Sequence, residues 1–237
     1  MDRNSNVYTF SFASILVIVV ALILAFVSQA TKDRYESNIK KEKMQSILAT
    51  IGVDVDRDQA AKVFKDYVKQ ELTLNADGSV NTGVDAFNID LHKEIKKDPK
   101  NQLYPIYLVE KDGKKFYVVP LYGAGLWDAI WGYISLNDDK NTVEGTVFDH
   151  KGETPGLGAQ ITEKWFQKQF IGKTILKDAS AGFTDNNFIS VRTVKGGAKV
   201  GDMHGVDAIS GGTKTSDGIN DMIKERLAHY LIYFKNN

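Results

Sequence analysis

An uncharged apolar run near the N-terminus is the strongest pattern of hydrophobic and polar positions in the chain. From Phe10 to Val27 every residue is apolar or a serine. Extended to Ala30, the run is long enough to cross a hydrocarbon core of about 30 Å as a helix. We therefore predict a short N-terminal segment over residues 1–9 and a transmembrane helix over residues 10–30. Because this span has no ionisable side chain, it cannot by itself carry ions or protons.

The alternative is a cleaved signal peptide with Ser28-Gln29-Ala30 as its cleavage site. The apolar run is longer than a usual signal-peptide core of about 7–15 residues, and only Arg3 is basic before it. These two features favour a retained span. Basic residues are more frequent after the span, which would keep the following domain in the cytoplasm. That rule is weak for long domains, so charge leaves the side of the membrane open.

The segment after the span is first rich in charged residues, and its apolar residues then recur at regular spacing. Residues 31–52 combine many charges with sparse apolar positions, and we predict a helical stalk there. Apolar residues between Arg57 and Leu72 recur at helical spacing, which predicts an amphipathic helix. Residues 73–100 are polar, with a turn at Asp77-Gly78, and are expected to hold short strands and loops.

The middle of the chain carries strand patterns. Asp112-Gly113, between two apolar runs, predicts a hairpin. The full set of expected elements is strands at Tyr104–Val109, Lys115–Leu121, Trp131–Leu136, Thr142–His150 and Phe188–Val194, and helices at Ile161–Ile171 and Gly218–Phe234. Strands in the middle and helices at both ends predict an α+β domain over residues 53–237, with an antiparallel-rich sheet flanked by helices.

Composition narrows the classes of function. The chain has 237 residues, 43% of them hydrophobic, enough for one sizeable core. Lys plus Arg and Asp plus Glu both number 30, so no global charge points to nucleic acid. With no cysteine, disulfides, thiolate catalysis and iron–sulfur ligation by this chain are excluded. The four histidines have no ligand spacing, and we expect no metal site.

Two glycine-rich loops in the sheet region could hold a flat ligand. One contains Gly125-Leu126-Trp127, and the other runs from His150 to Ala159 and includes Thr154, Gly156 and Leu157. Glycines let a backbone approach a ring closely, and Trp127 or Leu157 could cover its face. The alternatives are that Trp127 and Trp131 are core aromatics and that the second loop is a turn around Pro155. An acid–base pair of His150 and Glu153 is disfavoured, and we expect no catalytic residue.

A third small-residue loop, Asp207 to Ser216, precedes the closing helix. Backbone N–H groups at a helix N-terminus favour a bound anion. The alternative is an ordinary helix cap, in which Ser216 or Asp217 supplies the N-cap oxygen.

Taken together, the span and the three loops resemble a known family. Gly125-Leu126-Trp127, Glu153-Thr154-Pro155-Gly156-Leu157-Gly158 and Asp207-Ala-Ile-Ser-Gly-Gly-Thr213 are similar to motifs of the FMN-carrying subunit (C) of the bacterial Na⁺-translocating NADH:quinone reductase. In that family the last motif reads Asp-Gly-x-Ser/Thr-Gly-Ala-Thr, and its closing Thr carries FMN through a phosphoester. This chain has Ala208 and Gly212 where the family usually has Gly and Ala.

The resemblance implies a covalent FMN on Thr213, with Asp207, Ser210, Gly211 and Gly212 in the attachment motif. Thr215 is the rival hydroxyl, and motif register favours Thr213. The resemblance further implies that Trp127, Thr154 and Leu157 line the flavin ring, with Gly125 and Gly156 in the same loops.

The resemblance also implies partners and a location. It implies a six-subunit complex, an oxidoreductase and sodium translocase, in which electrons arrive from an iron–sulfur centre in two neighbouring subunits (D and E). They leave for the flavin of a further subunit (B) and end on quinone, such as ubiquinone. A flavin transferase installs the FMN. The chain is anchored in the lipid of the cell inner membrane by a single span, with its FMN domain in the periplasm.

Two other functions remain open at this level. The flavin subunit (G) of the ferredoxin:NAD oxidoreductase complex has a similar flavin motif. A membrane-tethered ligand-binding module with no redox role would also fit a span and an α+β domain. The stalk and the Glu153–Gly158 motif favour the quinone reductase.

Overall fold

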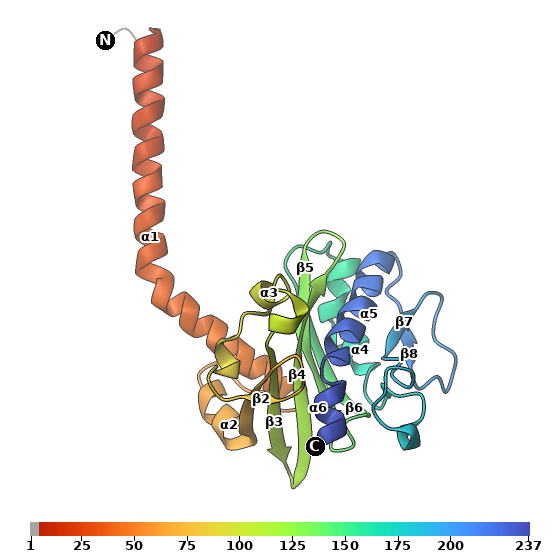
Figure 1. Cartoon of the computed structure of the whole chain (residues 1–237). Coiled ribbons are helices and arrows are strands. Elements are labelled where there is room, and N and C mark those ends of the chain that lie inside the picture. Colours follow the sequence, from red (N-terminus) through yellow and green to blue (C-terminus); the bar gives the residue numbers. More distant parts are fainter. Residues whose placement is uncertain (1–4) are drawn as a thin grey trace. The chain divides into compact units, whose positions relative to one another are not determined.

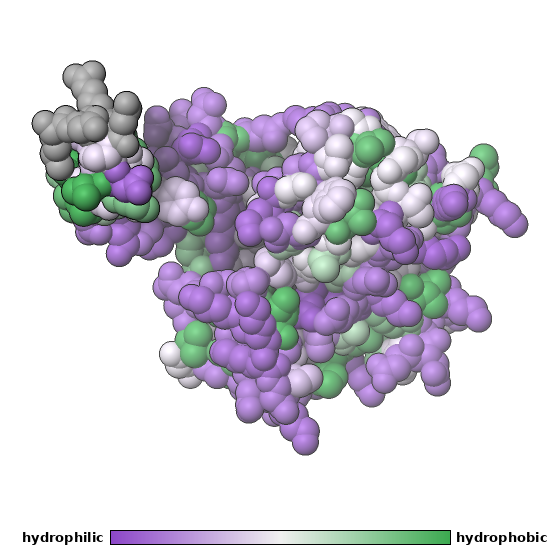
Figure 2. Space-filling view, turned by 90° about the horizontal axis from the view of Figure 1, so that it is seen from above, coloured by the Kyte–Doolittle hydropathy of each residue, from purple (hydrophilic) through white to green (hydrophobic). Residues whose placement is uncertain are grey.

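The structure, a computed structural model, describes residues 5–237, so Arg3 and the rest of residues 1–4 lie outside the described part. The chain forms two compact units, Met1–Lys43 and Met44–Asn237. Helix α1 (Asn6–Ala49) begins before the predicted span and continues through most of the predicted stalk. Within residues 5–237 it is the one helix long and apolar enough to cross a membrane. Its apolar side chains are exposed, and some appear green in Figure 2.

The second unit is built around a six-stranded antiparallel sheet in the order β2-β1-β3-β4-β5-β6 (Figure 1). The strands are β1 (Val68–Leu74), β2 (Val80–Asn81), β3 (Tyr104–Lys111), β4 (Lys114–Ala124), β5 (Ala129–Asn137) and β6 (Val143–His150). The hairpin of β3 and β4 is confirmed, since Asp112 and Gly113 both have positive φ, as its two-residue turn requires. The predicted α+β class with an antiparallel sheet is likewise confirmed.

The helix predicted over Arg57–Leu72 is wrong in its second half. Helix α2 ends early (Ala60–Tyr67), and the chain then enters β1 at Val68. Strand β1 pairs antiparallel with β3, and Leu74 at its end is fully buried. Pairing with a long neighbouring strand outweighs the weak local helical preference of this stretch.

Three further predictions are corrected in part. In place of the helix predicted at Ile161–Ile171, residues 158–168 form two short helices. The strand predicted at Phe188–Val194 is present only as β7 (Arg192–Val194), because Ser190 has a φ of 65°. Strand β7 pairs in parallel with β8 (Gly205–Asp207). The closing helix begins earlier and is broken, into α5 (Thr213–Ala228) and α6 (Leu231–Asn236). The shorter helices are η1 (Ala86–Asn88), α3 (Leu91–Glu94), η2 (Pro99–Asn101), η3 (Gly158–Thr162), α4 (Lys164–Lys168) and η4 (Ala179–Ala181).

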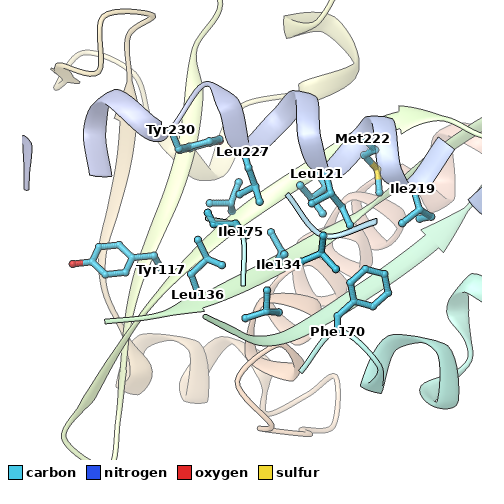
Figure 3. Packing of buried hydrophobic residues seen from close by; sticks show 14 of the residues in the cluster. Tyr117, Leu121, Ile134, Leu136, Phe170, Ile175, Ile219, Met222, Leu227 and Tyr230 are labelled. Carbon is cyan, nitrogen blue, oxygen red and sulfur yellow. The ribbon is translucent and has the colours of Figure 1, made fainter. Parts of the chain in front are cut away.

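Side chains of β4 alternate between two cores, as the two-residue period of a strand requires. Tyr117, Val119 and Leu121 join the larger core, while Phe116 and Val118 join a smaller one. In the larger core, α5 lies along the sheet, as the labelled side chains of both show in Figure 3. This packing fixes the start of α5 against the end of β4, where a side chain at Gly218 would overlap the carbonyl oxygen of Ala124.

The smaller core also receives the last residues of α1. Ile47 and Leu48 are fully buried, and the hydroxyl of Ser135 donates to the carbonyl of Thr50 at 2.8 Å. A side chain at Gly145 would overlap that same carbonyl oxygen, so a glycine is needed for this close approach. Residues 44–51, the end of the predicted stalk, therefore belong to the compact unit.

Candidate functional site

Three loops that are far apart in sequence meet beside the start of α5. They are the β4–β5 connection, the segment that follows β6, and the turn that precedes α5. Together they enclose a cleft of about 150 Å³, lined by Leu126, Glu153, Thr154, Leu157, Gly158, Gly211, Gly212, Thr213, Lys214 and Thr215. The structure thus brings the three glycine-rich loops of the sequence into one place.

Close packing in the turn before α5 explains its two glycines. Gly211 has a φ of 74°, a left-handed conformation that favours glycine, and a Cβ there would lie 2.6 Å from Leu157 Cδ2. Gly212 is buried, and a Cβ there would lie 2.9 Å from Ile209 Cγ2. The glycine at position 212 therefore suits the packing of this chain.

The start of α5 leaves backbone donors at the cleft. Gly212 is the N-cap residue and provides no side-chain cap. The N–H of Ser216 is the first to reach a helical acceptor, the Gly212 carbonyl at 2.9 Å. The amides of residues 213–215 therefore precede the first helical hydrogen bond, which is the arrangement that stabilises an anion.

The alternative in which Ser216 or Asp217 caps the helix is wrong. Both residues lie inside α5. Ser216 is fully buried, and its hydroxyl oxygen accepts the N–H of Ile209 at 3.1 Å. The hydroxyl thus fastens the preceding turn to the helix instead of capping it.

The two threonines at the helix start have different environments. Thr213 is half-buried and lines the cleft. Thr215 is only 1% exposed, and its hydroxyl donates to Glu153 Oε2 at 2.5 Å. Of the two threonines, Thr213 is therefore the one that a group entering from solvent can reach.

Glu153 lines the cleft and bonds to two of the elements around it. Its carboxylate is buried, and Oε1 accepts the backbone N–H of Trp127 at 3.1 Å. Its own N–H donates to His150 Nδ1 at 3.1 Å. The carboxylate is thus bonded to Trp127 and Thr215, whereas the contact with His150 is made by the backbone. The sequence around these residues did not predict the hydrogen bond between Thr215 and Glu153.

The alternative in which Trp127 and Trp131 form a pair of core aromatics is wrong. Trp127 is 70% exposed, and its Nε1 donates to Thr154 Oγ1 at 3.2 Å. Trp131 is half-buried in β5. Leu126 and Leu157 are also exposed, so the cleft has an open, apolar rim that a flat ring could cover.

Asp207 and Ser210 do not line the cleft. The Asp207 carboxylate accepts the N–H of Ala198 at 2.7 Å, and its own N–H donates to Gln169 Oε1 at 2.8 Å. Asp207 therefore orders the loop between β7 and β8, and Ser210 is exposed. Gly156 has a φ of 76° and shapes the turn beside Leu157, while a side chain at Gly125 would overlap Glu153 Oε1.

Apart from the buried Glu153, the charged residues at and beside the cleft are exposed to solvent. Lys214 lines the cleft and is exposed. Asp128 forms an ion pair with Lys151 at 2.9 Å. The N–H of Ala129 and then Lys151 lower the pKa of Asp128, and Asp128 raises the pKa of Lys151. Because both side chains are largely in solvent, this pair contributes little to stability.

Comparisons with known proteins agree on one family. The FMN-binding domain family matches residues 125–228. The crystal structure of the corresponding subunit (C) of the Na⁺-translocating NADH-quinone reductase from Parabacteroides distasonis is 36% identical, with a TM-score of 0.77, over 87% of this chain and 98% of that one. The crystal structure of Shewanella oneidensis NqrC is 29% identical, with a TM-score of 0.69, and the match covers 83% of this chain and 96% of that one. The same subunit of the Vibrio vulnificus reductase is 29% identical over 86% of this chain and 84% of its own.

Proposed function

Because the chain belongs to the NqrC family of Na⁺-translocating NADH-quinone reductase subunits, we propose that it carries FMN covalently on Thr213 and relays electrons in that reductase. The family includes an FMN-binding domain, matched here by residues 125–228. The position of Thr213 supports this proposal, because it begins α5, lines the cleft and is accessible, whereas Thr215 is buried.

The residues of the cleft fit an FMN phosphate. A phosphoester at Thr213 keeps a negative charge, which the amides at the start of α5 stabilise by about 0.3–1 kcal/mol at an exposed site. Thr215 is a poor attachment point, because its hydroxyl is buried and bonded to Glu153. The buried Gly212 and the left-handed Gly211 let the backbone approach the phosphate without a side chain in the way.

The apolar rim fits a partly exposed flavin ring. Thr154 and Leu157 line the cleft, and the indole of Trp127, outside that lining, is held beside it by its hydrogen bond to Thr154. We expect these three side chains to contact the flavin ring. A cleft of about 150 Å³ is too small to enclose a whole FMN. The ring edge would stay accessible, which suits exchange of electrons with another carrier more than catalysis on a bound substrate.

FMN supplies the electron-transfer chemistry, and the protein sets its position and surroundings. In the proposed route, electrons come from an iron–sulfur centre in two neighbouring subunits (D and E) and pass to the flavin of a further subunit (B). A separate flavin transferase attaches the FMN, so this chain needs no base to activate Thr213. The similarity to NqrC favours this route over the ferredoxin:NAD oxidoreductase alternative.

Removing the charge of Lys214 is expected to slow flavin attachment. Lys214→Gln takes away a cation beside the incoming phosphate, and the initial rate should fall about two- to five-fold at low salt, equivalent to about 0.3–1 kcal/mol. The rate is measured by in-gel flavin fluorescence after mixing purified chain with the transferase. Lys224→Gln, at an exposed position further along α5, serves as the control. An equal rate for both variants would show that Lys214 has no such role.

A single cysteine can test on which side of the inner membrane the domain lies. The natural chain has no cysteine, and Val200 is fully exposed. Val200→Cys is expected to react with a membrane-impermeant maleimide in spheroplasts, because we place the FMN domain in the periplasm. The natural chain gives the background signal. Labelling only after the membrane is permeabilised would place the domain in the cytoplasm.

A further inference from the structure

We infer that Glu153 is a positioning residue that holds the flavin attachment point and the ring wall at a fixed separation. The inference rests on the proposed function, since it assigns a role to a residue of the same cleft. Glu153 itself would not form the bond to the phosphate. It acts through Thr215 and Trp127, which belong to the two elements that the flavin would bridge.

The carboxylate joins three separate parts of the chain. Glu153 follows β6, Trp127 lies between β4 and β5, and Thr215 is in the first turn of α5. One carboxylate oxygen accepts the Trp127 N–H at 3.1 Å, and the other accepts the Thr215 hydroxyl at 2.5 Å. Thr213, the proposed attachment point, is two residues from Thr215 on the same helical turn. The carboxylate therefore connects the helical turn that carries Thr213 to the β4–β5 loop that carries Trp127.

Two glycines make room for this carboxylate. A side chain at Gly125 would overlap Glu153 Oε1, and a side chain at Gly158 would overlap both Glu153 Oε2 and the Thr215 hydroxyl. The loops on either side are thus shaped around the buried carboxylate. Such close packing restricts Glu153 to one position, and a group that cannot move can fix the groups bonded to it.

Loss of the carboxylate would release both elements. In Glu153→Ala, the buried Thr215 hydroxyl and the Trp127 N–H lose their acceptor. Gln is different, because its carbonyl can accept from Trp127 while its NH₂ group donates to the Thr215 oxygen. The Gln variant should therefore keep the hydrogen bonds to Trp127 and Thr215, whereas the Ala variant should lose both.

The test uses full-length chain made with the flavin transferase and purified in detergent. The amount of covalent FMN is measured by intact mass, and the order of the ring by fluorescence anisotropy and visible circular dichroism of the flavin. We expect Glu153→Ala to carry FMN with at least a two-fold lower anisotropy and a weakened visible dichroism. Glu153→Gln, and the control Glu163→Ala at an exposed site, should match the natural chain.

Each result bears on one claim. Natural anisotropy in a flavinylated Glu153→Ala protein would overturn the positioning role and leave the proposed function intact. A natural chain without any adduct would instead defeat the proposed function. If Glu153→Ala does not fold, Thr215→Val tests the positioning role instead, because it removes the hydrogen bond between Thr215 and the Glu153 carboxylate. We expect it to lower the anisotropy, and an unchanged value would overturn the role of Glu153.

Discussion

Thr213→Ala is expected to abolish the covalent flavin of the full-length chain. The hydroxyl of Thr213 lies in the cleft at the N-terminus of α5, and its removal leaves no oxygen there for a phosphoester. The neighbouring hydroxyl of Thr215 cannot replace it, because that group is buried and bonded to Glu153. In-gel flavin fluorescence after denaturation, with protein made alongside the transferase, measures the effect.

Thr215→Val is the matched variant for this experiment. Valine has nearly the same shape but lacks the hydroxyl, so the adduct should remain in full amount even if the ring becomes less ordered. The electron-relay account further predicts that a reductase assembled with Thr213→Ala loses quinone reduction by NADH. Fluorescence that survives in Thr213→Ala and disappears in Thr215→Val would reverse the assignment.

Gly218→Val is expected to lower the free energy of unfolding by about 1–3 kcal/mol. Gly218 lies where α5 crosses β4, and a Cβ there would overlap the carbonyl oxygen of Ala124. In a solvent-exposed helix the same change would be slightly stabilising. Gly has a helix propensity about 0.8–1 kcal/mol less favourable than that of Ala, and also less favourable than that of Val. The overlap with the Ala124 carbonyl therefore makes the substitution destabilising in spite of the better helix propensity of Val.

The comparison variant is Lys224→Val, at an exposed position of the same helix. Its free energy of unfolding should change by no more than about 0.5 kcal/mol. Urea unfolding of residues 44–237, which form one compact unit, followed by far-ultraviolet circular dichroism, gives both values. A Gly218→Val protein as stable as the natural one would mean that α5 does not approach β4 as closely as described.

The fold was predictable where the sequence pattern is local. The apolar run before Val27 needs only length and composition to predict a membrane span. Asp112-Gly113 forms the turn that its residue types favour, and β4 alternates between two cores as its pattern requires. In these places the local preference and the tertiary structure agree.

Other features depend on partners distant in sequence. Val68 and Leu72 fit a helical face, yet pairing with β3 makes them part of a strand. The start of α5 was predicted at Gly218 because the apolar period begins there, whereas the first turn contains Thr215 and Ser216, polar residues buried by bonds to distant loops. A buried polar residue that is satisfied by tertiary contacts leaves no periodic signal.

The candidate site was predicted in the same uneven way. The three loops were found from their glycine and small-residue content, and Thr213 from motif resemblance; the structure brings the loops together around one cleft. The motif alone did not reveal that Asp207 orders a different loop, or that Glu153 connects Trp127 to α5. These roles depend on where each side chain points, which residue order does not specify.

Tryptic mapping of the chain from its native membrane shows directly whether FMN is bound to Thr213. Cleavage after Lys199 and Lys214 gives a peptide of residues 200–214, which contains Thr213, and leaves Thr215 in the following peptide. The account predicts that the 200–214 peptide carries the mass of FMN as a phosphoester, with fragment ions placing it on Thr213 and not on Ser210. An unmodified 200–214 peptide, or FMN on the peptide that begins at Thr215, would contradict it.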